Sequence, residues 1–189
     1  MLGVLLAVAG CDQGSGTVTG DWLEAPGCDG VGTSRRFEPY HIELAVMGAE
    51  LGGDALMVRF APDASVPYDS DQLFVIIEGY RAARDEIATT GALTRPLADA
   101  RTQVPGSAQA QAGLALIGHC AYGPAPMLAR GTATFTRLGS RQGQNVTGEL
   151  RFDVVDERDG TTLGANFVAD FDFSVEVGEP YRAFSPRDL

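Results

Sequence analysis

The fold of this 189-residue chain is decided by two stretches of its sequence, Val146-Thr-Gly-Glu-Leu-Arg-Phe-Asp-Val154 and Asn166-Phe-Val-Ala-Asp-Phe-Asp-Phe-Ser-Val-Glu-Val177. Apolar side chains alternate with polar ones along both stretches, which is the period of a β-strand with one buried face. Asp159-Gly160 lies between them and is a strong turn signal, because both central residues of a type I′ turn need a positive φ. The two stretches therefore predict a long antiparallel hairpin that packs one face against a core.

Two registers keep the apolar side chains of this hairpin on one face. A two-residue turn at Asp159-Gly160 pairs Phe152 with Phe167, whereas a four-residue loop over 157–160 pairs Phe152 with Ala165. A slip of one residue would turn the apolar face of one strand into water, so both registers preserve the period of two. We expect the two-residue turn, with the four-residue loop as its competitor.

Shorter alternating or apolar runs predict further strands in the preceding part of the chain. The runs 73–77 and 114–120 are apolar on both faces, which is typical of central strands. The segment 18–25 predicts a short first strand or an extended arm, because β-formers there surround a lone Trp. The remaining predicted strands cover 40–47, 55–60 and 132–136.

Two segments are less well defined by their residues. For 81–90 the composition leaves helix and strand open, and 91–111 lacks periodicity, which predicts a long surface loop. Turn signals recur at short spacing and strands do not alternate with helices. We therefore expect an all-β fold, an antiparallel β-sandwich of about seven or eight strands that forms a single domain over residues 18–189.

An apolar run, Leu2 to Ala9, precedes Gly10-Cys11 near the start of the sequence. The run is too short for a membrane-spanning helix, which needs roughly 20 residues. Val8-Ala9-Gly10-Cys11 resembles the lipobox of bacterial lipoprotein signal peptides, in which the cysteine is acylated and becomes the mature N-terminus. The resemblance implies a signal peptide over 1–10, a lipid on Cys11, a tether over 11–17 and a location in the bacterial cell envelope.

Three further observations bear on this resemblance. Lipoprotein signals carry basic residues before the apolar run and this sequence has none there, which indicates that the gene starts farther upstream. The competing interpretation of the apolar run is a buried N-terminal strand or helix with an ordinary core cysteine. Asp12, directly after Cys11, does not decide between the inner and the outer membrane. The pattern of residues 131–136, 146–153 and 166–169 is similar to the C-terminal hairpins of small uncharacterised lipoproteins from high-GC bacteria, which implies no activity.

The cysteine count agrees with an acylated Cys11. The chain has three cysteines, and if Cys11 carries lipid the other two, Cys28 and Cys120, can form a disulfide, as expected of an exported protein. A metal site built from these cysteines with His41 and His119 is the alternative. It is disfavoured because neighbours on a strand, such as His119 and Cys120, point to opposite faces.

The net charge limits the partners that the chain can bind. The formal net charge is −11, and none of the first ten residues is charged. An acidic body repels phosphate backbones and anionic headgroups, so we expect no nucleic-acid partner, and contact with a membrane only through the N-terminal lipid. A protein or glycan partner is not defined by the sequence, and no cofactor is expected.

Paired carboxylates are the remaining candidates for chemistry. Asp69 and Asp71 lie in a proline-containing loop and are candidate Ca²⁺ ligands, although the ligand spacing of an EF-hand is missing and a solvated acidic loop is the favoured interpretation. Asp170 and Asp172 share one strand face and are candidates for a glycosidase pair, which would need an acid held in an apolar pocket. A polar outer face opposite the apolar one is the favoured interpretation of these two residues.

No nucleophile elbow, phosphate loop or zinc-protease motif is present in the sequence;. We therefore expect a lipid-anchored cell-envelope protein with a non-enzymatic binding or structural role. A Ca²⁺-dependent or carbohydrate-binding module and a carboxylate-based hydrolase are the alternatives.

Overall fold

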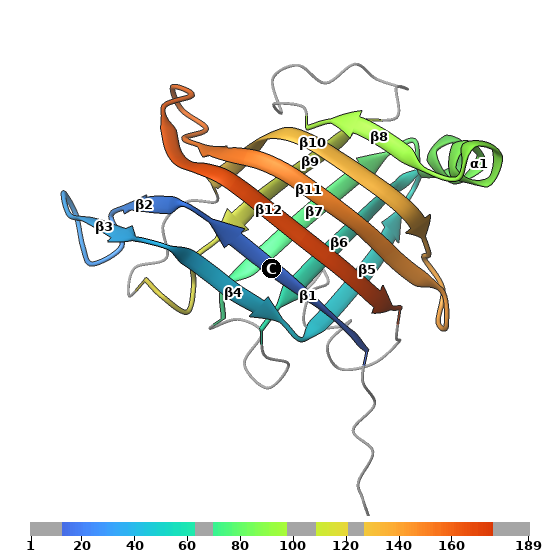
Figure 1. The fold of residues 1–189 in the computed structure, drawn as a ribbon, viewed down its shortest axis with the longest axis horizontal. Coiled ribbons are helices and arrows are strands. Elements are labelled where there is room, and N and C mark those ends of the chain that lie inside the picture. The colour runs from blue at the N-terminus through green and yellow to red at the C-terminus, as the bar shows by residue number, and fades with distance from the viewer. Residues whose placement is uncertain (1–12, 63–69, 98–108, 121–126, 176–189) are drawn as a thin grey trace, which may run out of the picture.

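The structure, a computed structural model, describes residues 13–62, 70–97, 109–120 and 127–175, which form twelve strands and one helix (Figure 1). In chain order these elements are β1 (Gly14–Gly20), β2 (Trp22–Pro26), β3 (Ser34–Phe37), β4 (Tyr40–Leu44), β5 (Val46–Gly52), β6 (Ala55–Ala61), β7 (Gln72–Glu78), α1 (Tyr80–Thr90), β8 (Leu93–Pro96), β9 (Ala110–Ala115), β10 (Met127–Leu138), β11 (Asn145–Val155) and β12 (Thr162–Ser174).

All the strands belong to one sheet whose neighbouring strands are antiparallel. The order along the sheet is β3-β2-β12-β11-β10-β9-β7-β6-β5, with β1 paired to both β12 and β4, and β8 paired to β10. The predicted all-β antiparallel fold is confirmed. The described residues contain twelve strands and not seven or eight. For example, β8 lies within 91–111, where the sequence predicts a loop, and the strand predicted over 40–47 is divided between β4 and β5.

The sheet is folded into two layers that face each other (Figure 1). A front layer of β4, β1, β12, β11 and β10 crosses a rear layer of β9, β7, β6 and β5. Aromatic rings fill the space between the layers: Phe60 of β6 lies 4.5 Å from Phe171 and 5.4 Å from Phe173, ring centre to ring centre. The alternating apolar residues of the long strands therefore form one core between the layers.

The β11–β12 hairpin combines features of both predicted registers. Phe152 pairs with Phe167, as the two-residue turn predicts. The loop is nevertheless the four-residue one, because the backbone N–H of Asp156 donates to the carbonyl oxygen of Thr161. Register shifts on either side of Val154 reconcile the two, and Asn166 adopts a positive φ of 57° beside them. Bulges thus correct the register that the longer loop would impose.

Strand β1 begins within the predicted tether. Residues 14–17 pair with β12 on one side, and the same strand pairs with β4 on the other from Gly16 onward. The prediction of a tether is therefore wrong for 14–17. The glycines that made this segment resemble a linker are required in the sheet, since a Cβ on Gly16 would lie 2.6 Å from the carbonyl oxygen of Asp170.

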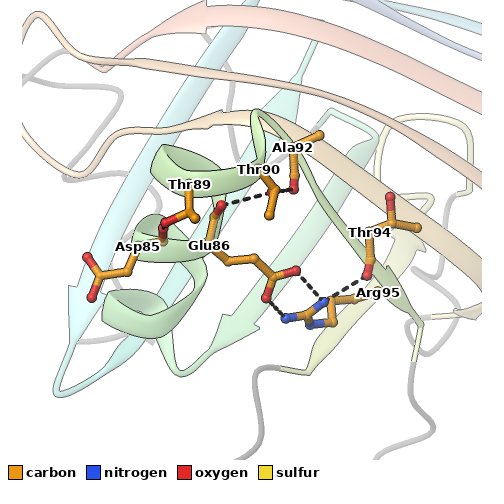
Figure 2. A network of polar contacts seen from close by, with 7 residues as sticks. All are labelled: Asp85, Glu86, Thr89, Thr90, Ala92, Thr94 and Arg95. Atoms are coloured by element: carbon orange, nitrogen blue, oxygen red, sulfur yellow. Dashed lines mark hydrogen bonds and ion pairs between the residues drawn. The ribbon is translucent and has the colours of Figure 1, made fainter.

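Residues 81–90, for which helix and strand were both open, belong to helix α1. Its Tyr80 and Ala83 are buried against the sheet, and the Tyr80 hydroxyl lies 2.8 Å from Ser140 Oγ. Figure 2 shows Glu86 of the helix paired with Arg95 of β8, which ties the helix to the strand that follows it. Within the described residues, no helix has the length and apolar character to cross a membrane.

Two other predicted segments need correction. The long loop predicted over 91–111 is interrupted by β8 and ends where β9 begins. The strand predicted over 114–120 ends at Ala115, and 117–119 form a turn. His119 therefore lies in a turn, whereas the sequence predicts it on a strand.

Candidate functional site

A disulfide joins the two layers near one end of the molecule. Cys28 follows β2 and Cys120 follows β9; they are 92 positions apart in sequence, and 4.5 Å separate their Cα atoms. Both cysteines are buried. The predicted pairing is confirmed, and it fastens the arm, which we define as residues 22–37 with strands β2 and β3, to the end of β9.

A buried carboxylate lies next to this disulfide. Asp71, directly before β7, is only 2 % exposed. Its Oδ1 accepts hydrogen bonds from the backbone N–H groups of Gly118 (2.9 Å) and His119 (3.1 Å), and its Oδ2 contacts Nδ1 of His119. Three donors from the turn after β9 thus satisfy the carboxylate and compensate for its burial.

The contact with Asp71 determines how His119 presents its ring. Because the carboxylate accepts the Nδ1 proton, the neutral imidazole carries its free lone pair on Nε2. The side chain is 49 % exposed. The ring can therefore accept a hydrogen bond from a bound molecule through Nε2.

Two residues of the arm complete the surroundings of His119. The edge of the Phe37 ring packs on the imidazole, with 5.4 Å between ring centres. Arg35 donates to the carbonyl oxygen of His119 (3.0 Å), and its guanidinium lies 5.3 Å from the centre of the Phe37 ring. We name the group formed by Arg35, Phe37, Asp71, His119 and the disulfide the junction.

The buried hydroxyl of Tyr40 is close enough to the junction to be affected by the charge of Asp71. Tyr40 is 3 % exposed, and within the part of the chain that the structure describes its hydroxyl has no hydrogen-bond partner. Burial, and then the negative charge of Asp71, raise the pKa of Tyr40 far above its usual value. The phenol therefore stays neutral at physiological pH.

The structure changes the interpretation of the first predicted acidic pair. Asp69 lies outside the described residues. Asp71 is not in a solvated loop, because its two oxygens hold the turn at 117–119. Among the described residues, no three His, Cys, Asp or Glu side chains are placed to hold a metal ion.

The two histidines have different surroundings. His119 belongs to a turn and not to a strand. His41 is exposed on β4, with Nε2 2.8 Å from Glu43 Oε1. His119 lies beside the disulfide, with its carbonyl oxygen 3.6 Å from Cys28 Sγ, but His41 does not join them. The two cysteines are bonded to each other and so are not free to bind a metal.

The second acidic pair lies on the outer face of the front layer, as predicted. Asp172 accepts hydrogen bonds from Thr147 Oγ1 (2.7 Å) and Asn145 Nδ2 (3.3 Å). The hydrogen bond from Thr147 is the main cause that lowers the pKa of Asp172. A general acid of a glycosidase needs the opposite shift. Asp170 is exposed on the same face, opposite Glu149 of β11 and Thr17 of β1.

An open hollow of about 480 Å³ separates the arm from the β11–β12 turn. Buried Met127 and Leu163 contribute apolar surface, and Asp156 and Arg158 line it from the turn. The arm contributes Ser34, among others. The hollow could accommodate a small polar group or an extended side chain of a partner.

No protein-family model matches the chain, and no curated protein or solved structure matches it either. Sequence analysis found the disulfide by counting cysteines but missed the pairing of Asp71 with His119. Gly118 was the available signal, because a glycine before His119 is a turn residue and breaks the apolar run.

Proposed function

We propose that the chain is a lipid-anchored protein of the bacterial cell envelope that binds a partner without catalysing a reaction. One observation carries the proposal. The disulfide uses Cys28 and Cys120, so the only other cysteine of the chain is Cys11 in the lipobox-like Val8-Ala9-Gly10-Cys11. A buried disulfide fits an oxidising compartment, and the cysteine outside it is the one that the lipoprotein resemblance marks for acylation.

The carboxylates support a binding role over the two alternatives. A calcium site would need the oxygens of Asp71, which are occupied by donors from the turn at 117–119. A hydrolase built on the β12 pair would need one of the two carboxyls held as an acid in an apolar pocket. Hydrogen bonding favours the ionised form of Asp172, and Asp170 is exposed on the outer face. These side chains therefore hold turns and strands together, and the hollow beside the arm is the partner site that the geometry favours.

The proposal is tested by mass spectrometry of the mature N-terminal peptide after expression of the full gene in a bacterium. Acyl chains on Cys11 and recovery in the membrane fraction are expected, and Cys11→Ser should release the protein into the soluble fraction. An unmodified Cys11 in soluble protein would overturn the proposal.

Two further measurements address the alternatives directly. A rise in melting temperature on addition of Ca²⁺ would favour the calcium-dependent module. Turnover on a panel of glycosides that is lost in both Asp170→Asn and Asp172→Asn would favour the hydrolase.

A further inference from the structure

We propose that the acylated protein sits directly on the bilayer, with one defined end of the domain against the lipid headgroups. This end, which we name the proximal end, consists of Gln13, the end of β12 and the β10–β11 turn at 139–144. The proposal rests on acylation of Cys11 and adds an orientation to it.

Only a short length of chain separates Cys11 from the folded domain. Gln13 is the first described residue, and two residues of chain span at most about 7 Å. The side chain of Gln13 is buried, at 8 % exposure. A lipid on Cys11 would therefore lie within about 7 Å of a residue that is part of the folded domain.

Gln13 is hydrogen-bonded to both layers of the fold. Its carbonyl oxygen accepts the backbone N–H of Ser174 at the end of β12 (2.6 Å). Its side-chain Oε1 accepts the backbone N–H of Met47 in β5 (3.1 Å). Gln13 is thus fixed to both layers, and a lipid attached two residues before it restricts how the whole domain can face the bilayer.

The surface beside Gln13 is formed by the end of β12 and the β10–β11 turn. The residue after Ser174, Val175, exchanges backbone hydrogen bonds with the β10–β11 turn: Gly143 N donates to its carbonyl oxygen (2.9 Å), and its own N–H donates to Gln144 (2.7 Å). In Figure 1 the start of β1, the end of β12 and this turn lie together at the lower right. The opposite turn, between β11 and β12, lies at the upper left.

The charges of the two turns differ in the direction that this orientation requires. The proximal turn contains Arg141 and no acidic residue. Exposed Arg137, the next-to-last residue of β10, lies beside the turn and close enough to Asp172 to help lower the pKa of that carboxyl. The opposite turn contains Asp156, Glu157 and Asp159 with a single arginine, Arg158. In a chain of net charge −11, the arginines of the proximal end face the anionic headgroups while the acidic turn points away.

The orientation also explains where a partner can bind. The hollow between the arm and the β11–β12 turn is at the end of β11 away from the anchor. The eleven residues of β11 separate the two turns by about 33 Å at roughly 3.3 Å per residue. The hollow is therefore held well clear of the headgroups.

The test compares two matched positions, one in each turn. Gln142→Cys and Glu157→Cys place single free thiols on exposed residues, because the native disulfide is buried and Cys11 carries lipid. Each variant is labelled with an environment-sensitive fluorophore and reconstituted in phosphatidylethanolamine–phosphatidylglycerol vesicles that contain a headgroup nitroxide lipid. We expect several-fold stronger quenching of the probe at 142 than of the probe at 157.

A lengthened tether is the control for orientation. Ten Gly and Ser residues inserted between Asp12 and Gln13 should abolish the difference between the two probes, while the protein still floats with the vesicles. Arg137→Gln with Arg141→Gln should reduce quenching at 142 in the native-length protein. Equal quenching at 142 and 157 in native-length protein that floats would overturn the orientation. Failure to float would instead overturn the acylation on which it rests.

Discussion

In the β11–β12 hairpin, apolar side chains on one face of each strand are buried against the rear layer and polar side chains face water. At the junction, by contrast, a buried carboxylate, a turn and a disulfide bring together residues that are distant in sequence. Phe171 represents the hairpin, since its ring contacts Phe60 across the core. Asp71 represents the junction, since its partners lie 47 and 48 positions away. The contrast teaches that the hairpin depends mainly on many buried apolar side chains, whereas the junction depends on single polar groups and one disulfide.

Removal of the disulfide is the strongest test of this contrast. Cys28→Ser with Cys120→Ser should lower the free energy of unfolding by roughly 4 to 5 kcal/mol, the chain-entropy value for a loop of this length. Urea unfolding measures the loss. Hydrogen exchange should show that the arm loses protection before Leu150 and Phe152 of the hairpin do. Simultaneous loss at both places would show that hairpin and junction form one cooperative unit.

The hairpin is tested by a cavity in its apolar face. Phe171 is 3 % exposed, and Phe171→Ala should cost roughly 3 to 5 kcal/mol, because the ring leaves a cavity between the layers. Chemical denaturation measures the cost. Asp170→Ala on the same strand is the matched control and should cost less than about 0.5 kcal/mol. Equal costs would mean that the two faces of β12 are assigned the wrong way round.

The junction is tested by removal of its carboxylate. Asp71→Ala leaves the amides of Gly118 and His119 without their acceptor and should cost about 1 to 3 kcal/mol. Asp71→Asn keeps an oxygen for the amides but loses the charge, so it should cost less than the alanine variant. A loss as small as that of Asp170→Ala would show that the junction does not depend on this carboxylate.

These two regions also explain what the sequence could predict. The hairpin was predictable because its signal is local: a period of two over consecutive residues defines the buried face and restricts the register to two candidates. Its bulges were not predictable, because the alternating pattern of apolar and polar residues does not mark the register shifts beside Val154 or the positive φ of Asn166. Phe152 therefore pairs as one candidate register predicts, although the loop belongs to the other.

The junction was predictable only in part. Counting cysteines is a constraint on the whole chain, so it gave the disulfide without any knowledge of the fold. Asp71 and His119 carry no such constraint, because a carboxylate and an imidazole are compatible with many partners. The tether was misjudged for a related reason: Gly14 and Gly16 resemble a linker until β12 is placed beside them.

The smallest predicted effect concerns a polar contact within the hairpin itself. Asp156 accepts hydrogen bonds from the side chain and the backbone N–H of Arg158, which lower the pKa of Asp156 from 3.8 to about 2. A carboxyl with a lower pKa in the folded protein contributes stability above its unfolded pKa, and that contribution is lost as the pH falls from about 4 to about 2. Arg158 is 81 % exposed, so solvent screening limits the contribution to less than about 1 kcal/mol.

Asp156→Asn isolates this contribution. Unfolding of the native protein and the variant is compared at pH 5 and at pH 2, where the other carboxyls titrate alike in both. The native protein should be slightly more stable than the variant at pH 5, and most of the difference should be lost at pH 2, where the carboxyl of folded Asp156 is about half protonated;. A difference larger than that of Asp71→Ala would reverse the contrast, because polar contacts would then matter more in the hairpin than at the junction.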